Sequence, residues 1–205
     1  MSTTVDPAAQ RRGRLVLLGL ALLFMGPLAA SWIWYFSGSS PAETRGTTNR
    51  GELISPARPL AQVAFPSLDG PAPDSFPRGV WTLMLIDGSG CQTACQETLI
   101  NLRQVNLALG NDVDRLRHAL LVTGTAPDVA ALRTQHRDLF LLDATGGAGP
   151  LFFKPFPTDA NGAVDGSRVY LSDPLGNLMM SYPMDGDPKN MLKDIEKLLR
   201  LSRIG

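Results

Sequence analysis

Cys91 and Cys95 are the only cysteines among the 205 residues, and they lie within the stretch GSGCQTACQ. A continuous apolar run at residues 81–86 precedes them, and a helical pattern of apolar residues follows. We therefore expect the pair between the end of a strand and the start of a helix, whose partial positive charge favours thiolate over thiol. Two sulfurs at this spacing can close a disulfide or hold one soft metal ion.

A structural disulfide is the simplest alternative for this pair. It would close a very small loop, where the entropic gain from a cross-link is least. The chain is also long enough to bury an ordinary core without a cross-link. We therefore expect Cys91 and Cys95 to be catalytic residues or metal ligands rather than only a staple.

The overall composition excludes some classes of function. Lys and Arg together number 19, as do Asp and Glu, so the net charge is zero. This balance lacks the basic surface typical of nucleic-acid-binding proteins, and we expect no nucleic-acid partner. Two histidines are too few to support a Ser/His/Asp arrangement or a zinc motif.

The N-terminal region is typical of a membrane anchor. Residues 1–14 are polar and contain three arginines, and residues 15–36 carry no charge and are long enough to cross a bilayer as a helix. The positive-inside rule then places residues 1–14 in the cytoplasm, with a single pass through the inner membrane and the remainder in the periplasm. A cleaved signal peptide is the alternative, but the apolar run is long and no A-x-A site ends it.

The region after the apolar run changes in composition. Residues 37–59 are rich in Ser, Pro, Gly and Thr and are predicted to be a linker. We expect the folded domain to comprise residues 60–205.

Strand and helix patterns alternate within this domain. The expected elements are an edge strand at 62–65, strands at 81–87, 119–123 and 139–142, helices at 95–109 and about 127–136, a loop at 146–166, a hairpin at 168–172 and 177–182, and a helix after Asp187. This order predicts an α/β, thioredoxin-like fold with a mixed central sheet and flanking helices. Its first strand–helix junction would present the cysteines at the carboxyl end of a strand.

Four motifs, in order, resemble those of the Sco/SenC family, which are membrane-anchored, thioredoxin-fold copper proteins needed to assemble the CuA centre of cytochrome c oxidase. The resemblance covers roughly residues 60–200 and the anchor. The motifs are FPRGVW at 76–81, the C-x-x-x-C pair, the segment from Leu109 to Thr123, and VDGS at 164–167 with YLSDPLG at 170–176. The resemblance implies an accessory role in oxidase biogenesis, with copper and with a respiratory oxidase subunit or its assembly factors as partners.

The sequence departs from the family pattern at the site itself. The family's third copper ligand is the His of VDHS, and Gly166 stands there; Gln92 and Gln96 replace two prolines of the family's cysteine motif. Two thiolates, Cys91 and Cys95, can still bind Cu(I), whereas Cu(II) prefers added nitrogen ligands. We therefore expect weak Cu(II) binding, if any.

Five other side chains could supply a further ligand. His118 and His136 are expected on the side opposite the cysteines, as surface or cap residues. Met179, Met180 and Met184 carry soft sulfur, but core packing is the expected role, and only one of the two strand neighbours can face a site.

Three functions remain open on this basis. The first is a Sco-like factor that carries Cu(I) or keeps the CuA-site thiols reduced, with Cys91 attacking and Cys95 resolving, or the reverse. The second is a general membrane-tethered thiol–disulfide oxidoreductase, although residues 162–167 lack the proline that such reductases place beside their cysteines. The third is a non-catalytic interaction domain with a structural disulfide.

Overall fold

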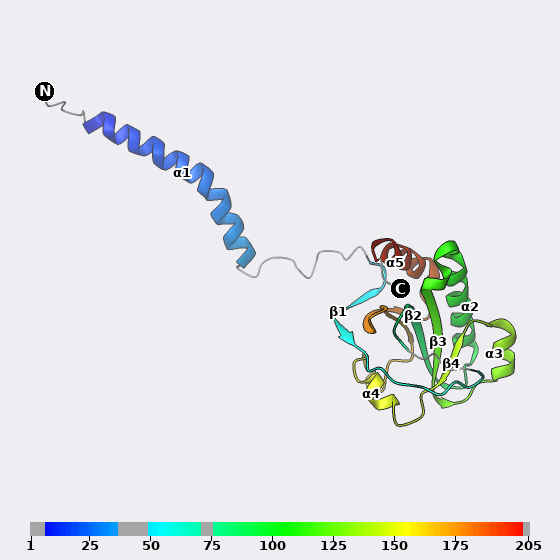
Figure 1. Cartoon of the computed structure of the whole chain (residues 1–205). Coiled ribbons are helices and arrows are strands. Elements are labelled where there is room, and N and C mark those ends of the chain that lie inside the picture. Colours follow the sequence, from blue (N-terminus) through cyan, green and yellow to red (C-terminus); the bar gives the residue numbers. More distant parts are fainter. Residues whose placement is uncertain (1–6, 37–48, 71–75, 203–205) are drawn as a thin grey trace. The chain divides into compact units, whose positions relative to one another are not determined.

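A computed structural model describes residues 7–36, 49–70 and 76–202 of the chain. The chain divides into an N-terminal unit, which holds helix α1 (Pro7–Phe36), and a domain that begins at Asn49 (Figure 1). Within α1, Arg11–Ile33 is long and apolar enough to cross a membrane, and none of it is buried in the protein. The predicted helix at 15–36 is therefore confirmed as a candidate membrane span.

A six-stranded mixed sheet forms the centre of the domain. Its strand order is β1-β6-β5-β2-β3-β4, in which β2, β3 and β4 are parallel and the other neighbours are antiparallel. The strands are β1 (Glu52–Pro59), β2 (Trp81–Ser89), β3 (Leu116–Thr125), β4 (Phe140–Asp143), β5 (Arg168–Ser172) and β6 (Asn177–Pro183). The mixed sheet and its hairpin confirm the thioredoxin-like fold predicted from the sequence.

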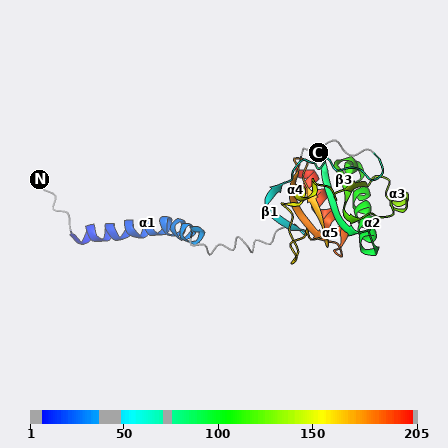
Figure 2. The same ribbon diagram turned by 90° about the horizontal axis from the view of Figure 1, so that it is seen from below.

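Helical segments connect strands β2 to β5, and a last helix follows β6. They are α2 (Thr93–Ala108), the 3₁₀ helix η1 (Gly110–Arg115), α3 (Val129–Gln135), α4 (Gly149–Phe153) and α5 (Pro188–Leu201). Asp128 caps α3 by accepting a hydrogen bond from the Ala131 N–H, and Asp187 caps α5 by accepting one from Lys189. Both views place α2 and α3 on one side of the domain and α4 on the other (Figures 1 and 2).

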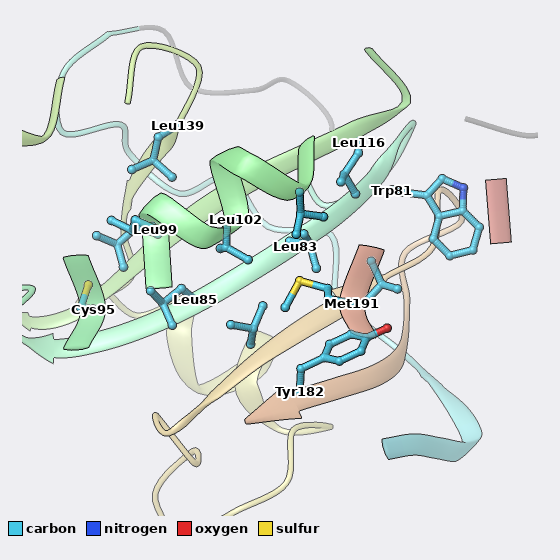
Figure 3. Close-up of a cluster of buried hydrophobic side chains, with 14 of the residues drawn as sticks. Trp81, Leu83, Leu85, Cys95, Leu99, Leu102, Leu116, Leu139, Tyr182 and Met191 are labelled. Atoms are coloured by element: carbon cyan, nitrogen blue, oxygen red, sulfur yellow. The ribbon is translucent and has the colours of Figure 1, made fainter. Parts of the chain in front are cut away.

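The sheet separates two hydrophobic clusters, because successive side chains of a strand point to opposite faces. Leu83 and Leu85 of β2 pack with α2 and α5, whereas Met84 and Ile86 pack on the face covered by α4. Figure 3 shows the first cluster, in which Leu99 and Leu102 of α2 lie over the β2 leucines. The central strand is therefore buried on both faces, as its continuous apolar run predicts.

The predicted boundary between linker and domain is wrong. Strand β1 lies inside residues 37–59 and pairs with β6, while residues 62–65 form no strand. The residues just before β1 are held by Asp194 of α5, whose carboxylate accepts hydrogen bonds from the backbone N–H groups of Arg50 and Gly51, each at 2.8 Å. The Tyr182 hydroxyl donates a further hydrogen bond to the same carboxylate at 3.3 Å.

The predicted loop at 146–166 also contains structure. Helix α4 lies within it and contributes Phe152 and Phe153 to a group of edge-to-face and tilted aromatic rings. Phe65, expected in a strand, packs its ring edge-on against Phe152 at 5.1 Å between centroids. This aromatic group covers the face of the sheet that α2 and α5 leave open.

Candidate functional site

Cys91 and Cys95 form a disulfide in which the Cα atoms are 5.0 Å apart. This separation lies within the usual range for disulfides. Both residues are buried, with Cys91 2% and Cys95 3% exposed, and both belong to the cluster beneath α2. Figure 3 shows Cys95 beside Leu99 and Leu85. The predicted meeting of the two cysteines at the start of a helix is confirmed.

The loop between β2 and α2 has an unusual backbone. Gly90 has φ +84°, and Cys91, at +52°, is the only non-glycine residue with positive φ in the described part of the chain. A non-glycine residue in this left-handed region has a conformational energy cost, which contacts with the surrounding structure must offset. The loop must therefore contain groups that fix Cys91.

Asp87 is the main group that fixes the loop. Its Oδ2 accepts hydrogen bonds from the backbone N–H groups of Ser89, at 2.9 Å, and Cys91, at 2.8 Å. Its Oδ1 accepts another from the Ser89 hydroxyl at 2.8 Å. A carboxylate that accepts bonds from the chain two and four residues ahead holds a tight turn, and here that turn carries a cysteine.

Two glutamines close the other side of the loop. The Gln96 side chain donates to the carbonyl oxygen of Cys91 at 3.1 Å, and the Gln92 side chain donates to that of Ser89 at 3.2 Å. These are the residues that stand where the Sco/SenC motif has prolines. The sequence showed them only as a departure from the motif; their hydrogen bonds give them a local role in this chain.

Close backbone contact lies under the same loop. A Cβ atom on Gly124 of β3 would come within 2.5 Å of the Gly88 carbonyl oxygen, so only glycine fits there. The carboxyl ends of β2 and β3 therefore approach each other directly below the cysteines. This edge of the sheet is where open α/β folds place their sites.

Gly166 lies beside this edge as well. A Cβ atom there would have one neighbour within 4 Å, the Ile86 carbonyl oxygen of β2 at 3.4 Å. The preceding Asp165 accepts a hydrogen bond from the Ser167 hydroxyl, which lowers the pKa of the Asp165 carboxyl. The position equivalent to the Sco/SenC histidine thus has room for a side chain, but Gly166 supplies no metal ligand there.

The two histidines lie away from the cysteines, as expected, but neither is a surface residue. His118 is 3% and His136 2% exposed, and His118 pairs in register with Leu83, well before the end of β2. Burial lowers the pKa of His118 to about 4; the charge of His136 adds to this effect and that of Asp138 opposes it. Burial also lowers the pKa of His136, which caps α3. The surface alternative was therefore wrong for both histidines, whereas the cap alternative is confirmed for His136.

The methionines divide into two groups. Met180 is fully buried in the core, where its sulfur lies 3.7 Å from the Tyr182 hydroxyl oxygen. Met179 and Met184 are half-buried and pack against the cluster that contains both cysteines. Core packing is confirmed for Met180. Among the described residues, no group of three or more His, Cys, Asp and Glu side chains could hold a metal ion.

Residues 81–202, from β2 to α5, match the family described as the transmembrane-like, thioredoxin-like, C-terminal domain. The chain belongs to this family. A comparison with curated proteins found no match.

Several solved structures share the fold. Apo Sco1 from Thermus thermophilus is 17% identical, with a TM-score of 0.58 over 76% of this chain and 99% of that one. Copper-bound ScoI from Arabidopsis thaliana is 16% identical, with a TM-score of 0.52 over 70% and 99%. A thiol:disulfide interchange protein from a Bacteroides species is 14% identical, with a TM-score of 0.51 over 72% and 91%. The resemblance to Sco/SenC proteins is thus confirmed in the fold.

Proposed function

We propose that this chain is a membrane-anchored, Sco-like accessory protein of cytochrome c oxidase assembly, which works by cycling Cys91 and Cys95 between disulfide and dithiol. The observation that carries the proposal is the disulfide itself. It joins a loop residue to the first turn of α2 at the carboxyl end of β2, on the fold of Sco proteins. The dithiol form can reduce a partner's disulfide or carry Cu(I).

The redox step is an ordinary thiol–disulfide exchange. The Cys91 thiolate attacks one sulfur of the partner's disulfide and forms a mixed disulfide, which releases one partner thiol. Cys95 then attacks the Cys91 sulfur, which releases the second partner thiol and leaves the Cys91–Cys95 disulfide. The protein gives up two electrons and two protons, and a dithiol donor must restore them. The loop position of Cys91 favours it as the attacking thiol.

Copper is cargo in this proposal. Two thiolates can hold Cu(I), because soft sulfur suits a soft ion and Cu(I) accepts two ligands. The Arabidopsis protein of the same fold is known with copper bound. In this chain the open position at Gly166 favours Cu(I) over Cu(II), since glycine supplies no nitrogen ligand at the position of the Sco/SenC histidine.

The anchor would set the location. Arginines at the start of the span, within α1, favour a cytoplasmic N-terminus. The domain from Asn49 would then face the periplasm from the inner membrane, where it could meet the CuA-bearing oxidase subunit or another assembly factor. An oxidising periplasm also suits a cysteine pair found as a disulfide.

One observation favours a second candidate, a structural disulfide in an interaction domain. Both cysteines are nearly inaccessible in the oxidised form, at 2% and 3% exposed. A partner thiol could reach them only after the loop moves. A buried, inert disulfide would have a low reduction potential, below about −300 mV, whereas working redox pairs span about −270 to −120 mV.

The reduction potential of the full chain in detergent therefore tests the proposal. We expect a value within the working range, measured by equilibration with glutathione or thioredoxin and quantified by thiol alkylation. The Cys91→Ser, Cys95→Ser double variant is the control that should show no redox-dependent alkylation. A potential below the working range would support the structural candidate. Loss of oxidase activity in cells with the double variant would link the pair to assembly.

A further inference from the structure

A cavity of about 370 Å³ lies beside the first turns of α2. On the α2 side it is lined by Ala94 and Thr98, which lie one residue before and three residues after Cys95; the two cysteines are buried behind this helix turn and are not among the lining residues. On the other side it is lined by Met184, the residue that follows β6. Met184 also packs, half-buried, against the cluster that contains both cysteines. A thioether thus lies next to the helix turn that carries the resolving cysteine.

The chain path brings Met184 to the same edge of the sheet as Gly166. Arg168 pairs with Pro183 across the β5–β6 hairpin, and the Met184 N–H donates to the Ser167 carbonyl oxygen at 3.0 Å. Met184 is therefore hydrogen-bonded to the neighbour of the residue that stands at the family's histidine position. The backbone here is fixed, while a methionine side chain has three rotatable bonds beyond Cα with which to place its sulfur.

The other polar groups in the cavity are poor ligands for Cu(I). Glu97, Asn101 and Asp185 line it with oxygen or amide donors. Thr98 is buried, and its hydroxyl donates to the Ala94 carbonyl oxygen at 2.8 Å. Cu(I) selects thiolate and thioether sulfur, and hard oxygen suits other ions. Met184 is thus the soft donor among the residues that line this cavity.

We propose that Met184 is the third ligand of Cu(I) in the reduced protein and serves in place of the missing histidine; this inference rests on the copper-carrying part of the proposed function. An external dithiol first reduces the Cys91–Cys95 disulfide with two electrons and two protons. Cu(I) then displaces the two thiol protons. The neutral Met184 sulfur adds without losing a proton, so the site carries one net negative charge. A third soft ligand would also raise selectivity for Cu(I) over Cu(II).

The test is Cu(I) titration of the full chain in detergent, reduced and under anaerobic conditions, against a competing chelator. Met184→Leu is compared with Met179→Leu, its matched control. Both methionines are half-buried against the same cluster. Met179, however, lies near the start of β6, at the opposite end of the β5–β6 strand pair from Ser167. We expect Met184→Leu to weaken Cu(I) binding by about tenfold or more, and Met179→Leu to leave it unchanged.

X-ray absorption at the copper edge provides a second readout, which counts the sulfur neighbours of Cu(I) directly. We expect three sulfur neighbours in the wild-type protein and two in Met184→Leu, with the reduction potential of the cysteine pair unchanged. Equal affinities for wild type and Met184→Leu, or two sulfurs in wild type, would overturn the role of Met184 but leave the cysteine site intact. Wild-type binding no tighter than that of Cys91→Ser would overturn both this inference and copper carriage.

Discussion

The two ends of helix α2 bury two reactive pairs of side chains in different ways. At its start, Cys91 and Cys95 are joined covalently, and Asp87 and Gln96 satisfy the loop around them with hydrogen bonds. Near its end, Asn106 contacts His118 at 3.4 Å and donates to the Leu116 carbonyl oxygen at 3.1 Å.

The histidine end is the less satisfied of the two. Among the buried polar atoms described, Asn106 Oδ1, His118 Nε2 and both ring nitrogens of His136 have no hydrogen-bond partner. Burial keeps these imidazoles neutral, because a charged ring there would lack both water and a partner. The unfolding free energy should therefore respond to reduction through the cysteines at the start of α2, and to pH through the histidines near its end.

The largest expected effect is acid destabilisation at the histidine end. Burial lowers the pKa of His118 from 6.5 to about 4 in the folded state. Above pH 6.5 both states are neutral and stability is full; as pH falls, the unfolded chain takes up the proton first, and stability is lost down to about pH 4. The expected loss is about 3 kcal/mol, measured by denaturant unfolding of the full chain in detergent at pH 7 and pH 4.

The matched variants for this prediction are His118→Leu and the double cysteine-to-serine variant. His118→Leu should remove most of the loss of unfolding free energy between pH 7 and pH 4, whatever it does to stability at pH 7. The second should retain the full pH dependence, because the cysteines lie at the other end of α2. A pH dependence that is the same in His118→Leu as in wild type would show that the histidine end is not the acid-sensitive one.

The next effect is the response of the cysteine end to reduction. Opening the Cys91–Cys95 disulfide releases a loop of only a few residues, so the unfolding free energy at pH 7 should fall by about 2 kcal/mol. Unfolding with and without a phosphine reductant measures this change. The Cys91→Ser, Cys95→Ser variant should show no response to the reductant. A wild-type chain equally stable in both conditions would contradict the prediction.

A smaller effect is expected at Asp87, with Asp143 as its control. Asp143, at the end of β4, makes the same kind of turn by accepting from the Thr145 N–H at 2.9 Å, but carries no cysteine. Alanine at either position should cost about 1 kcal/mol. Only Asp87→Ala should also raise the reduction potential, by about 20 mV, because Asp87 holds Cys91 at its positive φ in the oxidised loop. An equal shift in Asp143→Ala would remove that explanation.

Local sequence signals were sufficient for the elements that position the site. The apolar run of β2 and the DPLG turn of the hairpin specify their structures within a few residues, and both are confirmed. Strand β1 was missed because Pro56 and Pro59 argue against a strand. Its pairing comes from β6, and its start is fixed by Asp194, more than a hundred residues away.

The burial of the histidines was missed for a related reason. A histidine is usually intermediate in burial, and nothing near His136 in the sequence signals that it lies in the interior. The hydrogen bonds of Gln92 and Gln96 were equally hidden, because they depend on the turn that Asp87 imposes. The identities of the site residues were thus predictable, while the partners that restrain them were not.

The smallest change in stability is expected for Gly166→His. This substitution tests whether the site at the start of α2 can be made more like the copper site of Sco/SenC proteins. Gly166 lies outside the left-handed region, and a Cβ there would meet only the Ile86 carbonyl oxygen at ordinary contact distance, 3.4 Å. The substitution should therefore change the unfolding free energy by less than about 0.5 kcal/mol. An imidazole beside the two sulfurs should give the reduced chain a Cu(II) site that wild type lacks, visible by electron paramagnetic resonance. If the variant folds and binds no Cu(II), position 166 does not face the cysteines, and the loss of the family's histidine is then not what separates this chain from the copper-bound proteins of the same fold.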